Sequence, residues 1–212
     1  FTLVVLTNTK NFEYINRTVQ TIKEQIYDNY EILLLSDSTF DDSDLNNKKE
    51  NLQDVTCYTK LSDIKKNSNG DFICFVQSGD KLSKNALFKI TNHINTNPDS
   101  ELIYTDHDFY DKNNLRTNPF FKPDWSPFLF KSVDYVSTFF IVKKEIFNQI
   151  SFDIDSSSMA YSISKEITKK SKKISHIESP LCSINYDYIL SKQKSQTKKQ
   201  SMLNKKIIID DI

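Results

Sequence analysis

Short apolar runs separated by amphipathic segments constrain the fold of this chain more than any other feature. Residues 2–6 (TLVVL), 31–35 (EILLL) and 72–76 (FICFV) are continuous apolar runs of strand length. Such runs are typical of strands that are buried on both faces of a parallel sheet. Further strands are predicted at residues 55–58, 102–104, 138–142, 174–177 and 181–184.

Three helices are predicted between these strands. The first follows Asn11 as its N-cap and places on one face Ile15, Val19, Ile22 and Ile26. The second follows Ser83 as its N-cap and packs Leu87, Ile90 and Ile94. The third is centred on Met159, Ile163 and Ile167. Strands that alternate with helices predict an α/β sandwich with a mostly parallel central sheet.

Composition limits the classes of function. Hydrophobic residues make up 38% of the 212 residues, which supports a packed core. Lys+Arg and Asp+Glu are both 28, so the formal net charge is zero and we expect no nucleic-acid partner. No apolar run approaches the length of a membrane span, and no signal peptide is visible. The chain opens at Phe1 inside a strand and reads as an excised domain.

Glycine and cysteine usage narrow the choice further. Gly70 and Gly79 are the only glycines in the sequence, which excludes both a GxGxxG dinucleotide loop and a P-loop. Cys57, Cys74 and Cys182 lack metal-ligand spacing, and the first two read as buried small hydrophobic residues. This usage fits a reducing compartment, so we expect a cytoplasmic location.

Several motifs then occur in a characteristic order. They are Gln25-Ile26-Tyr27 with Glu31, the block 70–87 (GDFICFVQSGDKLSKNAL), Asn97-Pro98, the block 104–108 (YTDHD) and the block 121–127 (FKPDWSP). Together, over residues 2–184, they resemble the family 2 glycosyltransferases, in the subgroup of bacterial O-antigen and polysaccharide synthesis. The resemblance implies a GT-A three-layer sandwich in residues 1–190, with residues 191–212 as a linker or the start of a following element.

The resemblance also implies chemistry and partners. An inverting hexosyl-type transferase would take a nucleotide-diphosphate sugar as donor and a glycan as acceptor. A divalent cation, Mn²⁺ or Mg²⁺, held by a D-x-D motif, would offset the charge of the departing diphosphate. A separate carboxylate would deprotonate the acceptor hydroxyl. Such a protein would work in the cytoplasm, at the inner face of the membrane through other parts of the protein, and a further domain could follow residue 212.

Candidate site residues follow from the loops at the carboxyl ends of the strands, where ligands of such sheets bind. The candidates for nucleotide-sugar binding are Thr7, Asn8, Asp37, Gln77, Gly79 and Asp80. The candidates on the acceptor side are Asp124 and Trp125. Asp106 and Asp108 are the catalytic candidates, and the candidates for metal binding are Asp80, Asp106 and Asp108.

The sequence departs from the family pattern at residues that are expected to bind the metal ion and to act as the catalytic base. Gln77 and Gly79 stand where the two metal-facing aspartates of D-x-D are expected, and Asp80 is the remaining acid. Ala160 and Ser162 stand where the motif of the catalytic base carries acids. In addition, Ser36-Asp37 keeps one of two paired aspartates, and the loop 7–10 lacks the family's proline.

Each candidate has a structural alternative. Asp106 and Asp108 could belong to a polar turn with solvated acids, and Asp80 could cap the helix after Ser83. Asp37 could be an ordinary loop acid, and Trp125 could anchor its loop by packing instead of stacking on a sugar. His93 and His176 are expected to be packed or hydrogen-bonded residues. The lysines at 169, 170, 172 and 173 are expected to form a solvated helix end.

Two hypotheses of function remain open from the sequence. The first is a glycosyltransferase that uses a nucleotide sugar through a rebuilt or metal-independent diphosphate site, and whose transfer step could be impaired in this domain. The second is a catalytically inactive GT-A module that binds glycan or scaffolds an adjacent active domain.

Overall fold

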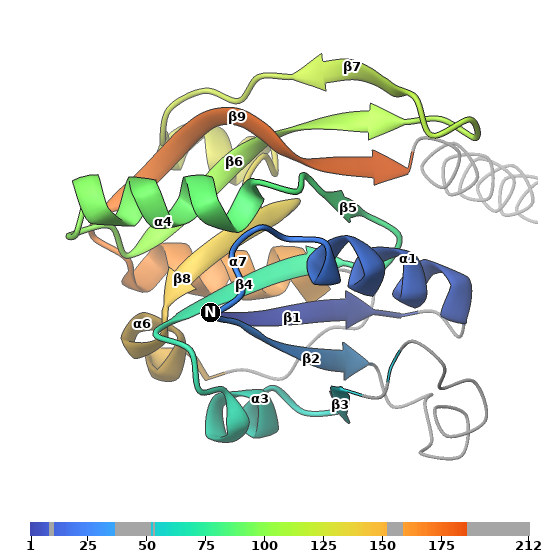
Figure 1. Cartoon of the computed structure of the whole chain (residues 1–212). Coiled ribbons are helices and arrows are strands. Elements are labelled where there is room, and N and C mark those ends of the chain that lie inside the picture. The colour runs from blue at the N-terminus through green and yellow to red at the C-terminus, as the bar shows by residue number, and fades with distance from the viewer. Residues whose placement is uncertain (9–10, 37–51, 53, 152–158, 186–212) are drawn as a thin grey trace, which may run out of the picture.

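The computed structural model describes residues 1–8, 11–36, 52, 54–151 and 159–185. Its centre is one nine-stranded sheet in the order β3-β2-β1-β4-β8-β6-β9-β5, with β7 beside β6 (Figure 1). The strands are β1 (Thr2–Thr7), β2 (Glu31–Ser36), β3 (Val55–Tyr58), β4 (Phe72–Gln77), β5 (Lys81–Leu82), β6 (Leu102–Tyr110), β7 (Arg116–Phe120), β8 (Phe139–Lys143) and β9 (Ile174–Asn185).

The directions of the strands confirm a mostly parallel sheet. The pairings give β1, β2, β3, β4, β6 and β9 one direction, which is six of the nine strands in the described part of the chain. β5, β7 and β8 run the opposite way. β8 is therefore an antiparallel strand inserted between the two parallel sets, β3-β2-β1-β4 and β6-β9.

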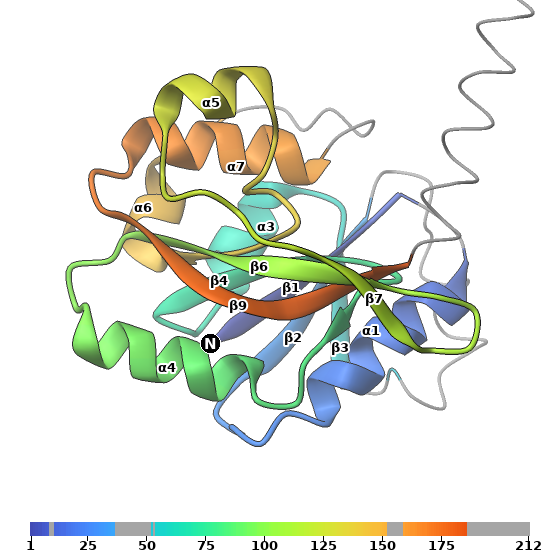
Figure 2. The same cartoon turned by 90° about the horizontal axis from the view of Figure 1, so that it is seen from above.

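Helices cover both faces of the sheet and make three layers (Figure 2). α1 (Phe12–Lys23) and α4 (Ala86–Thr96) lie on one face, and α3 (Leu61–Asn67), α5 (Pro127–Ser132), α6 (Lys144–Gln149) and α7 (Met159–Lys170) lie on the other. Each face has its own buried core. The α1/α4 core includes Ile15, Val19 and Ile90, and the α6/α7 core includes Phe75, Phe140 and Ile163.

The start of α1 follows its sequence pattern, whereas its end does not. Asn11 is the N-cap, and its side chain accepts the backbone N–H of Glu13 at 3.0 Å. Ile15, Val19 and Ile22 are buried as predicted. Ile26, however, is 65% exposed, because α1 ends at Lys23 and the apolar stripe of the helix ends with it.

The start of α4 is a correction to the prediction from Ser83. The helix begins at Ala86, and neither Ser83 nor Asp80 caps it. Instead the side chain of Gln25 accepts the backbone N–H of Leu87 at 3.0 Å and donates to the backbone carbonyl of Ser83 at 2.7 Å. Gln25 thus satisfies a free donor of the first turn from a distant part of the chain.

Other elements also differ from the sequence prediction. The strand predicted at 102–104 extends to Tyr110, and the two strands predicted in 174–184 form the single strand β9. β7, α3, α5 and α6 lie in stretches with no predicted element. The long strands β6 and β9 stabilise each other by parallel pairing over most of their length, which no local pattern shows.

Two further predictions can be compared with the described residues. Cys74 is buried as expected, but Cys57 is only partly buried, and neither these two nor Cys182 forms a disulfide. Within the described ranges, no helix combines the length and apolar character needed to cross a bilayer. The domain boundary at residue 190 stays a prediction, because residues 186–212 lie outside the described residues.

The amino-terminal edge of the sheet depends on a close backbone approach at Gly70. A Cβ at this position would lie 2.5 Å from the backbone of both Phe1 and Thr2. The Gly70 N–H donates to the Thr2 hydroxyl at 3.0 Å, and this hydroxyl donates to Glu31 at 2.5 Å. Only a residue without a side chain allows this chain of contacts.

We therefore expect Gly70→Ala to lower the free energy of unfolding by about 1 to 3 kcal/mol, because the added methyl must displace backbone. Urea unfolding followed by circular dichroism measures this change. Asp71→Ala, at the exposed neighbouring residue, is the control and should change the free energy by less than about 0.5 kcal/mol. Equal stability of the two variants would contradict the close approach.

Candidate functional site

The register of the sheet places Gln77 and Asp106 at the same level. Phe75 of β4 and Tyr104 of β6 both pair with Phe140 of β8, one on each side. Gln77 and Asp106 each lie two residues further along, in the same direction. β8 begins at Phe139, so at this level residues 134–138 lead into it. We call this region, made of Gln77, Asp106 and residues 134–138, the β4–β6 edge.

Both side chains face the same layer of helices. Residues two apart on a strand share a face, so Gln77 follows Phe75, and Asp106 follows Tyr104, into the layer of α5, α6 and α7. Because β8 lies between β4 and β6, the backbones at Gln77 and Asp106 are two strand spacings apart, or about 10 Å. The start of α7 is the third element at this edge. The end of α7 leads into β9, whose first residue pairs with Leu102 at the opposite edge of the sheet, so the first turn of α7 lies on the side of Gln77 and Asp106.

Asp106 is the centre of a hydrogen-bonded network. Its side chain is only 1% exposed, and its Oδ1 lies 2.8 Å from His176 Nε2 and accepts the backbone N–H of Lys122 at 2.8 Å. The ring of His176 stacks on Tyr104 with centroids 4.7 Å apart. The prediction of a polar turn with solvated acids is therefore wrong, because the extended β6 and its neighbours bury the carboxylate.

The acceptor-side loop is attached to this network. The Tyr104 hydroxyl donates to the Pro123 carbonyl at 2.6 Å. Asp124 Oδ1 lies 3.6 Å from His176 Nδ1, while the Asp124 side chain is 91% exposed. Trp125 packs against Phe130 and Tyr135, with ring centroids 5.5 and 6.3 Å away. These contacts are those of the packing anchor that the sequence left as an alternative for Trp125.

Asp108 lies in a separate interaction. Arg116 Nε donates to its Oδ2 at 2.5 Å, and Arg116 Nη2 donates to the Pro180 carbonyl at 2.9 Å. The carboxylate is buried, and this ion pair links β6, β7 and β9. The structure therefore does not bring Asp106 and Asp108 together on one ligand, although they are two residues apart.

The loop after β4 packs closely on β1 and α1. The Ser78 hydroxyl donates to the Thr7 hydroxyl at 3.1 Å, and the Ser78 N–H donates to the Leu6 carbonyl at 2.8 Å. The Gly79 N–H donates to the Thr18 hydroxyl at 2.9 Å. These contacts hold the loop in place. The Thr7 hydroxyl is therefore engaged in a hydrogen bond within the protein.

Gly79 faces α1, on the opposite side of the sheet from Gln77. Its φ is +98°, and a Cβ there would point at the Tyr14 ring, with the nearest atom 3.6 Å away. Its carbonyl accepts a hydrogen bond from the Tyr110 hydroxyl. A side chain at residue 79 would therefore point away from the β4–β6 edge.

The comparisons with known proteins agree with this architecture. With 18% sequence identity, the chain superposes on Staphylococcus aureus TarS 1–349 in complex with UDP-GlcNAc with a TM-score of 0.65, covering 87% of this chain and 58% of that one. The mannosyltransferase PcManGT from Pyrobaculum calidifontis, in complex with GDP-Man and Mn²⁺, gives a TM-score of 0.57 at 13% identity, covering 86% and 55%. The chain has a GT-A fold.

Sequence similarity points in the same direction. The chain is 37% identical over 117 residues to the O-antigen biosynthesis protein RfbC of Myxococcus xanthus, which is 53% of this chain and 9% of RfbC. The chain thus spans less than a tenth of that curated relative. No family model matches the chain. The predicted GT-A fold and the likeness to polysaccharide glycosyltransferases are confirmed, whereas the assignment to family 2 stays a prediction.

Residues 77 and 79, which the resemblance places at the D-x-D position, do not fit a divalent cation. Gln77 offers an uncharged amide, and Gly79 offers no side chain and faces α1. Hard cations such as Mn²⁺ and Mg²⁺ favour carboxylate ligands. Within the described ranges, no three side chains among His, Cys, Asp and Glu gather as metal ligands.

The remaining candidates have these positions. Asp80 is 6% exposed, and its carbonyl accepts the Thr18 hydroxyl at 2.7 Å. Asn8 is half-buried directly after β1, and Asp37 lies outside the described residues. Ala160 packs against the α6/α7 core in the first turn of α7, and Ser162 follows it in the same helix. The roles of these residues in ligand binding stay predictions.

Two buried bases near this edge were not selected from the sequence. Lys122 is 6% exposed and its Nζ has no hydrogen-bond partner among the described residues. Burial lowers the pKa of Lys122 to about 8, while Cys182, Asp106 and Asp134 oppose this shift. Burial, together with the charge of Lys122, lowers the pKa of His107 to about 4. No sequence signal marked Lys122 as buried, since its apolar neighbours Phe121 and Pro123 are themselves exposed.

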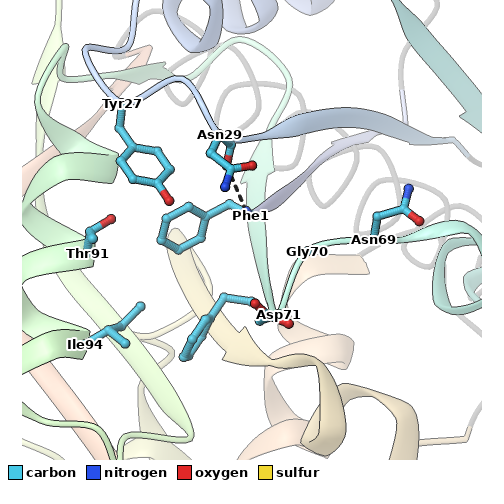
Figure 3. Close-up of a pocket in the computed structure, with 9 residues that line it drawn as sticks. Phe1, Tyr27, Asn29, Asn69, Gly70, Asp71, Thr91 and Ile94 are labelled. Atoms are coloured by element: carbon cyan, nitrogen blue, oxygen red, sulfur yellow. Dashed lines mark hydrogen bonds between the residues drawn. The ribbon is translucent and has the colours of Figure 1, made fainter.

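A hollow elsewhere contains none of the candidates. Its volume is about 300 Å³, and Figure 3 shows its lining, which includes Phe1, Tyr27, Asn29 and Ile94. The Phe1 amino group donates to the Asn29 carbonyl at 3.1 Å. The hollow lies at the amino ends of β1 and β4, the edge opposite the one where ligands of such sheets bind. We assign it no part in the site.

Placing aspartates at residues 77 and 79, as the resemblance expects, should have unequal costs in stability. We expect Gly79→Asp to lower the free energy of unfolding by about 1 to 3 kcal/mol, because an L-residue is strained at φ +98°. Gln77→Asp, at the partly exposed end of a regular strand, should cost less than about 1 kcal/mol. Chemical denaturation of both variants measures the difference. A Gly79→Asp variant as stable as Gln77→Asp would show that residue 79 tolerates a side chain.

His107 should make stability fall with acid. The pKa of His107 is lowered to about 4 in the folded protein and lies near 6.5 in the unfolded chain. The unfolded chain therefore binds more protons between pH 6.5 and 4, so stability decreases as pH falls through this window. The loss should be about 2 to 3 kcal/mol larger for the wild type than for His107→Gln. Denaturation at pH 7.5, 6, 5 and 4 measures it, and parallel curves would contradict a buried neutral imidazole.

Proposed function

We propose that this chain is a family 2 glycosyltransferase domain that binds a nucleotide-diphosphate sugar in bacterial cell-surface polysaccharide synthesis, with an impaired transfer step. The observation that carries the proposal is the register that puts Gln77, Asp106 and the first turn of α7 at one edge of the sheet. Support comes from TarS with UDP-GlcNAc, PcManGT with GDP-Man, and RfbC.

The strand ends and the loop after β4 support the binding of a nucleotide sugar, which is the first part of the proposed function. β1, β4 and β6 end or pass at the same edge, and the loop after β4 is fixed by hydrogen bonds to Thr7 and Thr18. A fixed loop costs little entropy when a ligand binds, so it favours recognition of the nucleotide part. The glycan acceptor would approach from the side of Asp124, whose carboxylate is exposed.

The transfer half lacks its usual groups. Inverting transfer needs a base that removes the proton of the acceptor hydroxyl and a positive charge that stabilises the leaving diphosphate. Ala160 and Ser162 provide no carboxylate at the start of α7. Asp106 is the buried carboxylate of the β4–β6 edge, but its Oδ1 already contacts His176 and Lys122. We therefore infer slow transfer relative to a complete site.

The cellular setting follows from the substrates. A nucleotide-sugar donor and an acceptor glycan imply work in the cytoplasm, at the inner face of the membrane through other parts of the protein. A further domain after residue 212 would be the natural partner of a domain with an incomplete site.

Binding and turnover can be separated by experiment. We expect UDP-GlcNAc or GDP-mannose to bind with a dissociation constant below about 1 mM, equivalent to about 4 kcal/mol. Release of nucleoside diphosphate should be slow, and Ala160→Asp should raise it because the new carboxylate can act as base. Calorimetry measures binding, and an assay of released diphosphate measures turnover. Absence of binding of either donor at 1 mM would refute the proposal.

A second candidate is a non-catalytic module that binds glycan or scaffolds an active domain. Gly79 favours it, because its φ of +98° strains any residue with a side chain, and a Cβ there would point toward Tyr14 and away from the β4–β6 edge. Under this candidate, oligosaccharides bind whereas nucleotide sugars do not. Titration of both ligand classes against the same protein decides between the two functions.

A further inference from the structure

We propose that the ammonium group of Lys122 binds the diphosphate of the nucleotide sugar at the β4–β6 edge, where it takes the place of the divalent cation for which residues 77 and 79 supply no charged ligand. This inference rests on the proposed binding of a nucleotide sugar. It names the group that would hold the charged part of that donor.

The position of Lys122 follows from its contacts. Lys122 comes two residues after β7, and its backbone N–H is held by Asp106 Oδ1 at 2.8 Å. Asp106 is level with Gln77 across the β4–β6 edge. Burial lowers the pKa of the amine, and Cys182, Asp106 and Asp134 oppose this shift. Because the Lys122 backbone is held on Asp106 and its side chain is buried, we place the amine beside the β4–β6 edge.

The amine is buried without an acceptor. Lys122 is 6% exposed, and its Nζ has no hydrogen-bond partner within the described part of the chain. An ammonium group carries three donors, and leaving them unpaired in a buried position is costly. A bound anion would satisfy these donors and remove the cost. The nearby carboxylates influence the amine by charge but do not accept its hydrogen bonds.

Other basic groups at this position are already engaged or neutral. Arg116 is committed to Asp108 and to the Pro180 carbonyl. His107 is uncharged at neutral pH, because burial and Lys122 lower its pKa to about 4. Lysine binds phosphate as a compact point charge. The chemistry of the edge therefore favours a diphosphate held by Lys122.

Three variants and two ligands test this assignment on the full chain. Calorimetry measures the binding of UDP and of inorganic pyrophosphate, each with EDTA and then with Mn²⁺. We expect affinity to be unchanged by EDTA within twofold, and Lys122→Met to weaken it at least about tenfold. Lys122→Arg should retain part of the affinity because it keeps the charge. Lys131→Met, at an exposed lysine of α5, is the matched control and should bind like the wild type.

A stability measurement shows that the Lys122→Met variant is folded. Because it removes a buried, unpaired ammonium, it should melt about 3 to 8 °C above the wild type in the absence of ligand. The wild type should gain thermal stability on addition of pyrophosphate, and Lys122→Met should gain none. A Lys122→Met variant that melts lower than the wild type would contradict an unpaired amine.

The outcomes separate this inference from the proposed function. UDP binding that requires Mn²⁺, or that Lys122→Met leaves intact, overturns the role of Lys122 while nucleotide binding stands. Pyrophosphate binding that depends on Lys122 without any binding of UDP or nucleotide sugar supports the anion site and refutes the nucleotide-sugar function. Failure of both ligands to bind the wild type overturns both.

Discussion

The pairing of β8 between β4 and β6 is the constraint on which the candidate site depends. Phe140 pairs with Phe75 on one side and with Tyr104 on the other, and the three rings lie in one buried layer. This pairing fixes the relative height of two parallel strands that belong to distant parts of the chain. Because β8 begins at Phe139, the sheet is interrupted at the level of Gln77 and Asp106. The same packed core that stabilises the fold therefore creates the edge at which ligands can bind.

At this edge the contacts of the scaffold are in place, whereas residues 77 and 79 provide no carboxylate. Asp106, His176 and Tyr104 hold the loop after β7 against the sheet, and these contacts do not need a ligand. The loop after β4 turns at Gly79, whose positive φ would direct a Cβ toward Tyr14. The buried amine of Lys122 is the compensating charge that the surrounding residues leave unpaired.

The sequence was most informative where side chains meet their local neighbours. β1, β2 and β4, the N-cap Asn11 and the burial of Ile15, Val19 and Ile22 follow from periodicity and capping alone. It was least informative where distant segments stabilise each other. The Pro-containing strand β7 exists because it pairs with β6, and α4 begins at Ala86 because Gln25 satisfies the N–H of Leu87. Local propensity contains neither the partner strand nor the distant cap.

The amino-acid sequence by itself determined the α/β class, the GT-A resemblance and the absence of carboxylates at residues 77, 79, 160 and 162, because these depend on residue types and their order. Only the tertiary structure decided what the candidate residues can do. It buried Asp106 against His176, paired Asp108 with Arg116 and turned Gly79 toward α1. It also left the amine of Lys122 without a hydrogen-bond partner among the residues that the structure describes. The physical reason is that charge and hydrogen bonding at a site are set by strand register and burial, which arise only when segments far apart in the chain pack together.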